Sequence, residues 1–279
     1  MVSGRQDSDV KPEESRGAVS FMETTRRSTW PVELLNNVAP KNRIYGLVEI
    51  DVTKARRFIS ENEAKTGEKL SFTAWVIKCI AQAVSEHREV QAFKKGKKKL
   101  IVFDDVDVGL IVERQVKSER VALPYAVRKA NEKSFRQIHD EIRRAQQNQE
   151  TTSGGGAFGE ELPASVRVFL RLPSFLRKPF WWKIRSDPFL KKRFLGTVGV
   201  AAVGMFGKGG GWAIPIGLHS VVVALGGISS RPRDLANPVE VGEYLSTTVM
   251  FDEEVSLGGP AARFLARLSE LMQAGFGLE

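Results

Sequence analysis

The sequence predicts an α/β domain in which helices flank a mixed sheet. Along its 279 residues, short runs rich in β-branched residues alternate with segments of helical periodicity. Hydrophobic residues make up 42% of the chain, which is enough for a sizeable core. We expect residues 1–40 to form a disordered tail and residues 41–279 to form a single domain, with an insertion at about 150–195.

The first predicted strand covers residues 43–52, and we expect Thr53 to cap a helix that ends before Gly67. Ser71 then starts a long apolar helix that runs to about Glu86.

A lysine-rich turn at residues 94–99 leads into two short β runs at 100–103 and 106–112. We interpret this turn as a solvated surface, with phosphate binding as the alternative. A further run at 121–130 is followed by Ser134, which can cap a helix over residues 135–148.

The last third of the chain begins after the glycine-rich break 151–156 and a basic, aromatic segment. It supplies three β runs and a final helix. Pro260 suits the first position of that helix, whose apolar stripe ends at Gly275. The β runs cover residues 196–206, 221–228 and 244–251.

The sequence also bears on the cellular location of the protein. Residues 1–30 lack the apolar stretch of a signal peptide, and the longest apolar run, 221–228, is too short to span a bilayer. The single cysteine, Cys79, lies among apolar residues of a predicted helix, so we expect a buried, inert thiol. We therefore expect a cytoplasmic protein.

The turn at residues 251–260 joins the last predicted strand to the last helix, and it carries the clearest functional signal. It resembles the Asp-His-Arg-x-x-Asp-Gly box of the dihydrolipoyl acyltransferases of 2-oxoacid dehydrogenase complexes. Their catalytic domain shares its fold with chloramphenicol acetyltransferase. The helix after this turn, with Ala261 and Phe264, resembles the family's Ala-x-x-Phe helix.

Three other segments carry the same resemblance, which runs from about Arg43 to Leu278 around the insertion. Residues 87–93 resemble the family's His-Pro-x-x-Asn-Ala turn. Residues 121–124 resemble its Gly-Leu-Val-Val-Pro segment, and residues 196–207 resemble its Gly-Thr-Phe-Thr-Ile-Ser-Asn-Leu-Gly box. The resemblance implies a chloramphenicol acetyltransferase-like fold and a homotrimer, or a higher multiple, with channels between subunits.

The residues that carry the family's chemistry are replaced here. Glu253 stands where the family has its general base, a histidine, and Leu257 stands where it has its second aspartate, while Asp252 and Gly258 are kept. Ala201 stands at the position of the family's hydroxyl donor to the oxyanion. Losing such a donor costs about 10²–10³ in rate and losing the base roughly another 10²–10⁴, so the resemblance implies a degenerate site.

Two side chains, those of Glu253 and His219, are candidates to replace the missing base. Glu253 could serve if burial or the neighbouring Asp252 and Glu254 raised its pKa, although an acidic, solvated turn is the simpler interpretation. His219 precedes the 221–228 run and could reach the channel, or it could be structural. No metal site is expected, and coenzyme A or acyl-coenzyme A is the one cofactor that the resemblance implies.

The net charge of +9 is concentrated between residues 163 and 195, where nine basic residues face one acidic residue. No nucleic-acid motif accompanies these residues, so we do not expect nucleic acid as a partner. The prolines in this segment predict that no continuous amphipathic helix forms. We interpret it as a subunit-contact or core-covering arm, with a membrane surface or an acidic protein as the alternative partner.

Three functions therefore stay open. The first is a catalytically silent or weakened acyltransferase homologue that acts as an oligomeric scaffold or binding module. The second is an active coenzyme A-dependent acyltransferase that uses Glu253 or His219 as its base, with Asp252 beside it. The third is a membrane-surface protein recruited through residues 163–195.

Overall fold

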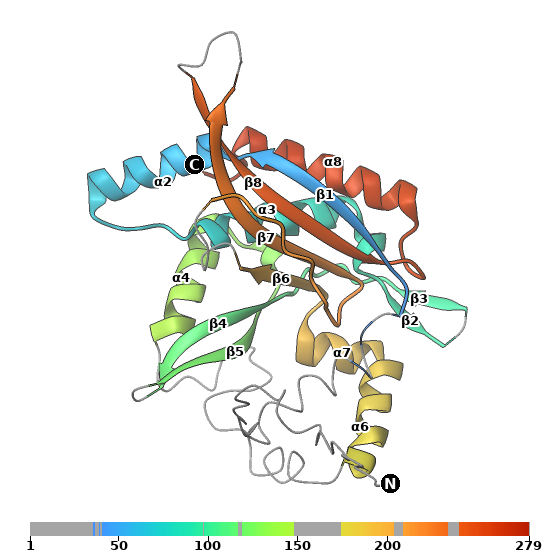
Figure 1. The fold of residues 1–279 in the computed structure, drawn as a ribbon. Coiled ribbons are helices and arrows are strands. Elements are labelled where there is room, and N and C mark those ends of the chain that lie inside the picture. Colours follow the sequence, from blue (N-terminus) through green and yellow to red (C-terminus); the bar gives the residue numbers. More distant parts are fainter. Residues whose placement is uncertain are drawn as a thin grey trace, which may run out of the picture.

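The computed structural model describes residues 41–96, 98–116, 119–147, 174–203, 209–233 and 240–278, together with Asn36 and Ala39. Six strands form one mixed sheet in the order β1-β8-β7-β6-β4-β5, which confirms the predicted α/β class (Figure 1). The expected tail lies outside the described residues apart from those two positions. Residues 151–173 of the expected insertion also lie outside the described residues. The strands of this sheet are β1 (Arg43–Asp51), β4 (Val108–Val116), β5 (Glu119–Val127), β6 (Val198–Ala202), β7 (Val221–Pro232) and β8 (Val241–Asp252).

The sheet combines a parallel centre with antiparallel margins. Strand β6 runs parallel to both β4 and β7, whereas β8 is antiparallel to β7 and β1, and β5 is antiparallel to β4. A separate hairpin of β2 (Phe93–Lys95) and β3 (Lys99–Ile101) contains the lysine-rich turn. Two 3₁₀ turns, η2 (Arg88–Gln91) and η3 (Ala130–Glu132), lie between these elements.

Four helices cover one face of the sheet: α2 (Thr53–Thr66), α3 (Phe72–Glu86), α4 (Phe135–Gln147) and α8 (Gly258–Ala274) (Figure 1). Helix α3 is central, and Trp75, Ile77 and Cys79 on it are fully buried, as its apolar sequence predicts. Burial raises the pKa of the Cys79 thiol, which keeps it protonated and unreactive.

The starts of α3 and α2 differ in whether the predicted N-cap is present. The Ser71 hydroxyl accepts a hydrogen bond from the Ala74 amide, so the predicted cap of α3 is confirmed. Thr53 does not cap α2 as predicted. It occupies the first helical position, and its amide and hydroxyl both donate to the Asp51 carboxylate. An ionised carboxylate accepts charge-assisted hydrogen bonds, so Asp51, two residues before the expected cap, accepts the first amide of the helix.

Helix α8 also begins earlier than expected. Its first residue is Gly258, so Pro260 lies in the first turn and not at the first position. The N-cap is Leu257, whose side chain cannot accept a hydrogen bond. Gly275 ends the helix in the left-handed conformation at φ 69°, as the sequence predicts.

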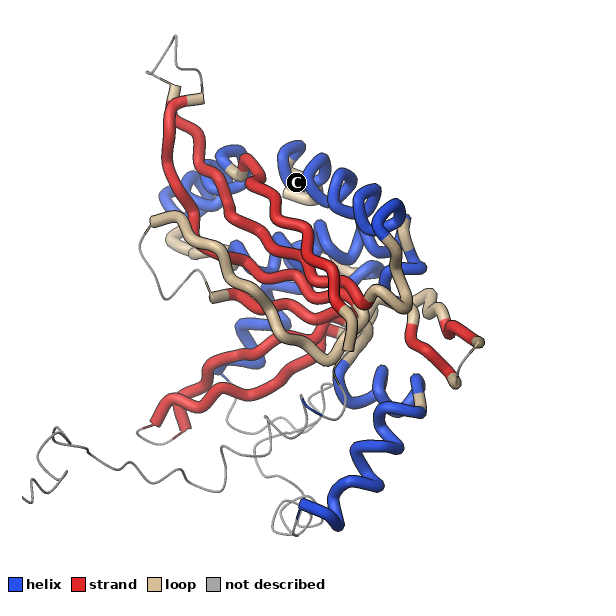
Figure 2. The backbone as a smooth tube through the Cα atoms, turned by 45° about the vertical axis from the view of Figure 1, so that its right-hand side comes forward, coloured by secondary structure: helices blue, strands red, loops and turns tan. Residues whose placement is uncertain are grey.

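An extended segment, residues 209–217, crosses the face of the sheet that the four helices leave open (Figure 2). The Gly227 amide donates to the Gly211 carbonyl over 2.8 Å, and the Tyr45 hydroxyl donates to the Pro215 carbonyl over 3.4 Å. Strand β7 carries Gly226 and Gly227 here, because a Cβ at Gly226 would lie 2.1 Å from the Gly211 carbonyl oxygen.

The basic, aromatic segment forms two helices, α6 (Ser174–Ser186) and α7 (Pro188–Leu195), at one end of the sheet beside the β2–β3 hairpin (Figure 1). The prediction that prolines would prevent a continuous helix is wrong, because α6 continues through Pro179. A proline removes one backbone donor, and packing of the apolar side of α6 stabilises the rest of the helix. Trp181 and Ile184 form a small buried cluster with Leu190 and Leu218.

Helix α7 is capped at its start by a residue of its own segment and is joined to the sheet at its end. The Asp187 carboxylate accepts the amides of Phe189 and Leu190 at its start. At its end, the Arg128 guanidinium donates to the carbonyls of Lys192 and Arg193 and to the buried Asp107 carboxylate. Gly196 follows with φ 88°, where a Cβ would lie 2.6 Å from the Asp107 carbonyl oxygen.

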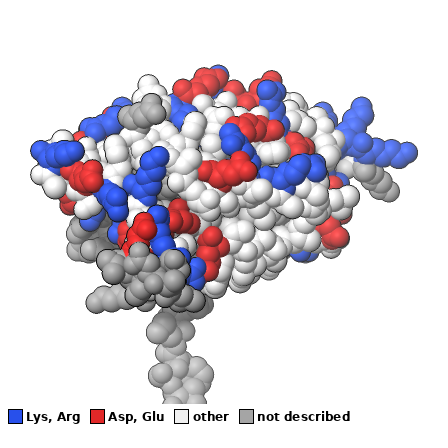
Figure 3. Space-filling view, turned by 90° about the horizontal axis from the view of Figure 1, so that it is seen from above, with Lys and Arg blue, Asp and Glu red and all other residues white. Residues whose placement is uncertain are grey.

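Charge is mixed on the surface away from these helices. Seen from above, basic and acidic side chains are interspersed, with no patch of a single sign (Figure 3). Ion pairs such as Arg233 with Asp51, 2.7 Å apart, account for part of this balance. In the described residues, no helix is both long and apolar enough to cross a membrane.

Candidate functional site

The turn after β8 is organised by Asp252. Its amide donates to the Ser220 carbonyl over 2.7 Å, and its carboxylate accepts the Glu254 amide over 3.0 Å. The Asp252 carbonyl accepts the amides of Val255 and Ser256, which closes the turn. Asp252, which this chain shares with the family's motif, therefore fixes the backbone of this turn, as the sequence predicts for a strand-to-helix connection.

Glu253, at the predicted position of the general base, points into solvent. Its amide donates to the Asn42 carbonyl, and in the described part of the chain its carboxylate accepts no hydrogen bond and forms no ion pair. A general base must be held within hydrogen-bond reach of the proton that it removes. Nothing in the described chain holds Glu253 in that way.

The carboxylates on either side of Glu253 have different surroundings. Asp252 is buried with 8% exposure, and that burial raises its pKa above the ordinary value. Glu254 is exposed and pairs with Lys94 of the β2–β3 hairpin over 2.5 Å, and this hydrogen bond lowers its pKa. Only Asp252 therefore lies in an environment that favours proton uptake.

His219 is enclosed beneath the end of α7. Its Nε2 lies 2.9 Å from the Leu195 carbonyl oxygen, which accepts the Nε2 proton and fixes the tautomer. The ring packs against Gly109 and Gly199, where a Cβ would lie within 3.3 Å of Nε2 and 2.7 Å of Nδ1 respectively. Burial lowers the pKa of His219 to about 4, so the imidazole is neutral at pH 7. Its ring faces Gly109 of β4 and Gly199 of β6.

Ala201 lies apart from the turn's acidic groups, whereas Leu257 lies in the turn itself, directly before α8. Ala201 pairs with Ala224, which pairs with Thr248 across β7 and β8. Glu253 follows Thr248 by five positions along β8 and its turn, or roughly 16 Å for an extended chain. One copy of the chain therefore does not bring the positions of the base and the oxyanion donor together. Leu257 is 65% exposed.

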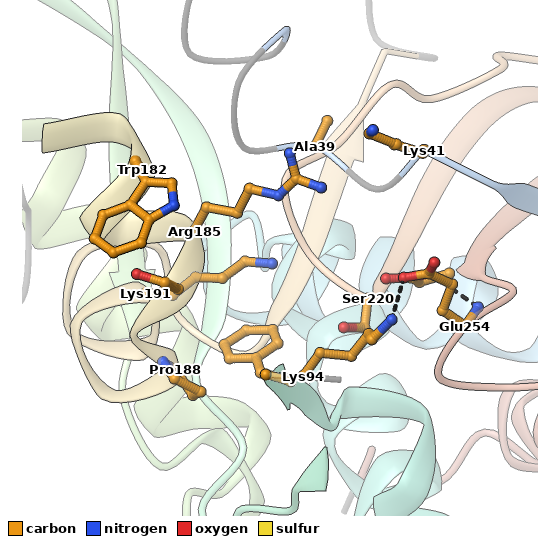
Figure 4. Close-up of a pocket in the computed structure, with 13 residues that line it drawn as sticks. Ala39, Lys41, Lys94, Trp182, Arg185, Pro188, Lys191, Ser220 and Glu254 are labelled. Carbon is orange, nitrogen blue, oxygen red and sulfur yellow. Dashed lines mark hydrogen bonds and ion pairs between the residues drawn. The ribbon is translucent and has the colours of Figure 1, made fainter. Parts of the chain in front are cut away.

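A cavity of about 330 Å³ lies between α6, α7, the β2–β3 hairpin and the end of β8. Asp252, Glu254, Ser220 and Lys94 line it from the sheet side, and α6 and α7 contribute Arg185 and Lys191. Figure 4 shows the Arg185 and Lys191 side chains extending into the same space, opposite Lys94 and Glu254. Sequence reasoning missed this site, because it found the lysine-rich turn and the basic segment but had no signal that would bring them together.

Glu68, His139 and Asp140 form the one cluster of described residues with the spacing of metal ligands. The Nδ1 atom of His139 accepts the Ser71 amide over 2.9 Å, so the ring proton lies on Nε2, which faces Glu68 at 3.4 Å. A metal at Nε2 would require that proton to leave while Nδ1 still faces a donor. The cluster therefore fits a hydrogen-bonded pair and not a metal site.

Comparison with known protein families gives a match over residues 24–153 to the family described as 2-oxoacid dehydrogenases acyltransferase (catalytic domain). A comparison with curated protein sequences finds no match.

Several solved structures share the fold. A probable dihydrolipoamide acetyltransferase from Listeria monocytogenes is 16% identical, with a TM-score of 0.62 over 92% of this chain and 95% of that one. Azotobacter vinelandii dihydrolipoamide acetyltransferase is 18% identical, with a TM-score of 0.63 over 92% of each chain. A truncated catalytic core of the 2-oxoacid dehydrogenase complex from Thermoplasma acidophilum is 15% identical, with a TM-score of 0.60 over 93% of this chain and 100% of that one. Residues 24–153 thus match the model of the 2-oxoacid dehydrogenase acyltransferase catalytic domain, and the described chain shares the fold of these solved acetyltransferase structures.

Proposed function

We propose that the protein is a catalytically silent or much weakened acyltransferase homologue that acts as an oligomeric scaffold or binding module. The observation that carries this proposal is the placement of Glu253, which is exposed and unsupported at the position of the base. The other candidate, the His219 imidazole, is neutral, enclosed and hydrogen bonded to a carbonyl. Neither group is held where it could remove a proton from an acyl acceptor.

The replaced residues of this chain can be compared with those of a solved structure of the same fold. The Azotobacter vinelandii enzyme was studied for the role of a serine, a histidine and an asparagine in its catalytic mechanism. At the positions that we match to these three residues, this chain has Ala201, Glu253 and Leu257. An alanine cannot donate a hydrogen bond to an oxyanion, and an exposed leucine can neither donate nor accept one.

The oligomeric part of the proposal rests on the uncovered apolar side chains of residues 209–217. Ile214 and Ile216 are 58% and 62% exposed, and Leu47 and Tyr45 of the edge strand β1 lie on the same side of the sheet. Exposed apolar side chains grouped in this way mark contact surfaces. Relatives of this fold form the cubic core of the pyruvate dehydrogenase complex, and we propose a trimer for this chain.

The catalytic part of the proposal is tested by following acetyl transfer from acetyl-coenzyme A to dihydrolipoamide. We expect a rate about 10⁴–10⁷ below that of an intact homologue, because a base and an oxyanion donor are both missing. Glu253→Gln should leave this residual rate unchanged. Turnover that is well above the uncatalysed reaction and disappears in Glu253→Gln would overturn the proposal in favour of an active acyltransferase.

A further inference from the structure

Lys191 is an unusual residue on α7, because its cationic side chain is buried without a carboxylate in contact. Only 9% of the residue is exposed, and its ammonium forms no ion pair with an acidic side chain among the described residues. The ammonium lies 4.4 Å from the centre of the Phe93 ring, and the charge of Asp252 acts on it from further away. Burying an ammonium with so little compensation is unfavourable unless another negative group completes the site.

The cavity described above supplies the space for such a group. The Lys191 ammonium and the Arg185 guanidinium from α6 point into it (Figure 4), and Lys41, two residues before β1, also lines it. No ion pair of Arg185 or Lys41 occurs in the described chain. Three cations therefore converge on a volume of about 330 Å³ that nothing described fills.

The two carboxylates of the cavity are already engaged. Glu254 pairs with Lys94, and the Asp252 carboxylate accepts the Glu254 amide while its raised pKa reflects its burial. Counting Lys41, Lys94, Arg185 and Lys191 against Asp252 and Glu254, the lining carries four positive and two negative charges. A guest with two negative charges would neutralise this lining.

The geometry points to an anion site in this cavity that takes a phosphate monoester or inorganic phosphate. A phosphate group carries nearly two negative charges at pH 7 and several strong acceptor oxygens. Arg185 offers a planar fork of donors and Lys191 a single ammonium, which is a combination that suits phosphate oxygens. The Ser220 side chain is excluded as a donor to the guest, because its hydroxyl already donates to the Ala92 carbonyl over 2.6 Å.

The site is separate from the proposed loss of acyl transfer. Its cations come mainly from α6, α7 and the β2–β3 hairpin, whereas the replaced positions Ala201 and Leu257 do not line the cavity. Trp182, which is 70% exposed, lies at the rim. A phosphate could therefore arrive either on a soluble molecule or on the headgroup of a lipid whose chains contact this apolar rim.

The test is titration of the full chain with inorganic phosphate, followed by thermal unfolding and by ³¹P nuclear magnetic resonance. We expect saturable binding that raises the melting temperature, since a ligand that binds only the folded state stabilises it. Lys191→Met and Arg185→Gln should each weaken the affinity about 10- to 100-fold, as for loss of a charge-assisted hydrogen bond. Arg185 is exposed, so its variant keeps the test valid if the buried substitution perturbs folding.

Lys183→Met is the matched control, because Lys183 is an exposed cation on α6 that does not line the cavity. It should bind phosphate like the unaltered protein. Absence of saturable phosphate binding, or equal weakening in the Lys183 control, would overturn the site and reduce the effect to general charge.

Vesicle sedimentation identifies the source of the phosphate. Phosphatidylcholine vesicles with and without phosphatidic acid should be compared in the unaltered protein, Lys191→Met and Trp182→Ala. Sedimentation that requires phosphatidic acid and both side chains assigns the site to a lipid headgroup. If inorganic phosphate binds but vesicles do not, the site is assigned to a soluble phosphate. Vesicle binding that Lys191→Met leaves unchanged would contradict a phosphate site in this cavity.

Discussion

At the scale of single residues, Leu257 shows what replacement of a catalytic position did to local structure. It is the N-cap of α8, its φ and ψ of −77° and 171° are those of a capping residue, and it is 65% exposed. An apolar side chain there leaves the first amides of the helix without a side-chain acceptor. The position has therefore lost a helix cap as well as the family's polar residue.

Leu257→Asp should stabilise the protein by about 1 kcal/mol, because aspartate accepts hydrogen bonds from the first turn and favours the positive end of the helix dipole. Urea unfolding at pH 7 measures this change in the free energy of unfolding. Leu257→Ala is the control, since it removes the exposed leucine without adding an acceptor. Equal stabilities of the two variants would contradict the capping argument.

His219 should make the protein sensitive to acid. Its pKa is about 4 in the folded protein and near 6.5 when unfolded, so between these values the unfolded chain binds a proton that the folded chain does not. Stability should fall as the pH falls from 6.5 to 4, by up to about 3 kcal/mol. The contribution is absent above pH 6.5, where both states are neutral.

The check is urea unfolding of the unaltered protein and of His219→Gln at several pH values in that window. The variant should lose stability at every pH, because its amide cannot replace the packed ring, but its stability should fall less steeply with acid. Parallel curves for the two proteins would show that His219 does not titrate in the manner described.

Sequence patterns predicted the role of a single residue correctly where its hydrogen-bond partner is close in the sequence. Ser71 and Ser134 each cap the helix that follows them, and in the second case the Ser134 amide donates a hydrogen bond to Gln137 Oε1. Lys191 could not be recognised as a buried cation, because its surroundings come from Phe93 and Asp252, which are distant in sequence. Such three-dimensional contacts leave no short-range pattern.

At the scale of elements, the last turn of α7 is tied to the end of β5 by the Arg128 side chain. Arg128 donates to two carbonyls in that turn and pairs with Asp107 over 3.1 Å, where the Asp107 side chain is only 6% exposed. A carboxylate that loses such a partner remains buried and only partly compensated. The position of α7 therefore depends on the end of β5.

Arg128→Met should lower the free energy of unfolding by roughly 2–4 kcal/mol and loosen α7. Hydrogen exchange should increase at residues 188–195 before it increases in α3. Arg144→Met is the matched control, because Arg144 is exposed and donates only to the Asp140 carbonyl in its own helix. Unchanged exchange in α7 would indicate that Arg128 does not hold it.

The elements also show where propensity misled the prediction. Proline is a strong helix breaker in isolation, so the sequence favoured an interrupted segment, yet α6 contains Pro179 within its 13 residues. The buried cluster around Trp181 and Ile184 stabilises the helix through packing. Tertiary contacts of this kind override local preference.

At the scale of the whole molecule, the proposed oligomer depends on the apolar segment 209–217. Ile214→Asp combined with Ile216→Asp should convert the oligomer to a monomer, because a charged group buried in a contact without a partner is strongly unfavourable. Size-exclusion chromatography with light scattering measures the mass. Leu100→Asp, at a 45% exposed position on the separate β2–β3 hairpin, is the control and should leave the mass unchanged. A monomeric unaltered protein would contradict the proposal directly.

The sheet and its covering helices followed from the sequence, because alternating β runs and apolar stripes report burial on one face. The strand order and the placement of α6 and α7 did not follow, since both depend on contacts between distant segments. For the site, the motif located the turn at Asp252 but gave no indication of the cavity beside it. The sequence thus identified which positions had changed, and the structure identified which groups now lie together.

Gly196 joins α7 to β6 in a conformation that other residues rarely adopt, directly against the Asp107 carbonyl. Any side chain there would push the end of α7 outward, and that end supplies the Leu195 carbonyl that covers His219. The same displacement would carry Lys191 away from Phe93. Replacing this one glycine by alanine would therefore expose both the His219 imidazole and the Lys191 ammonium to water.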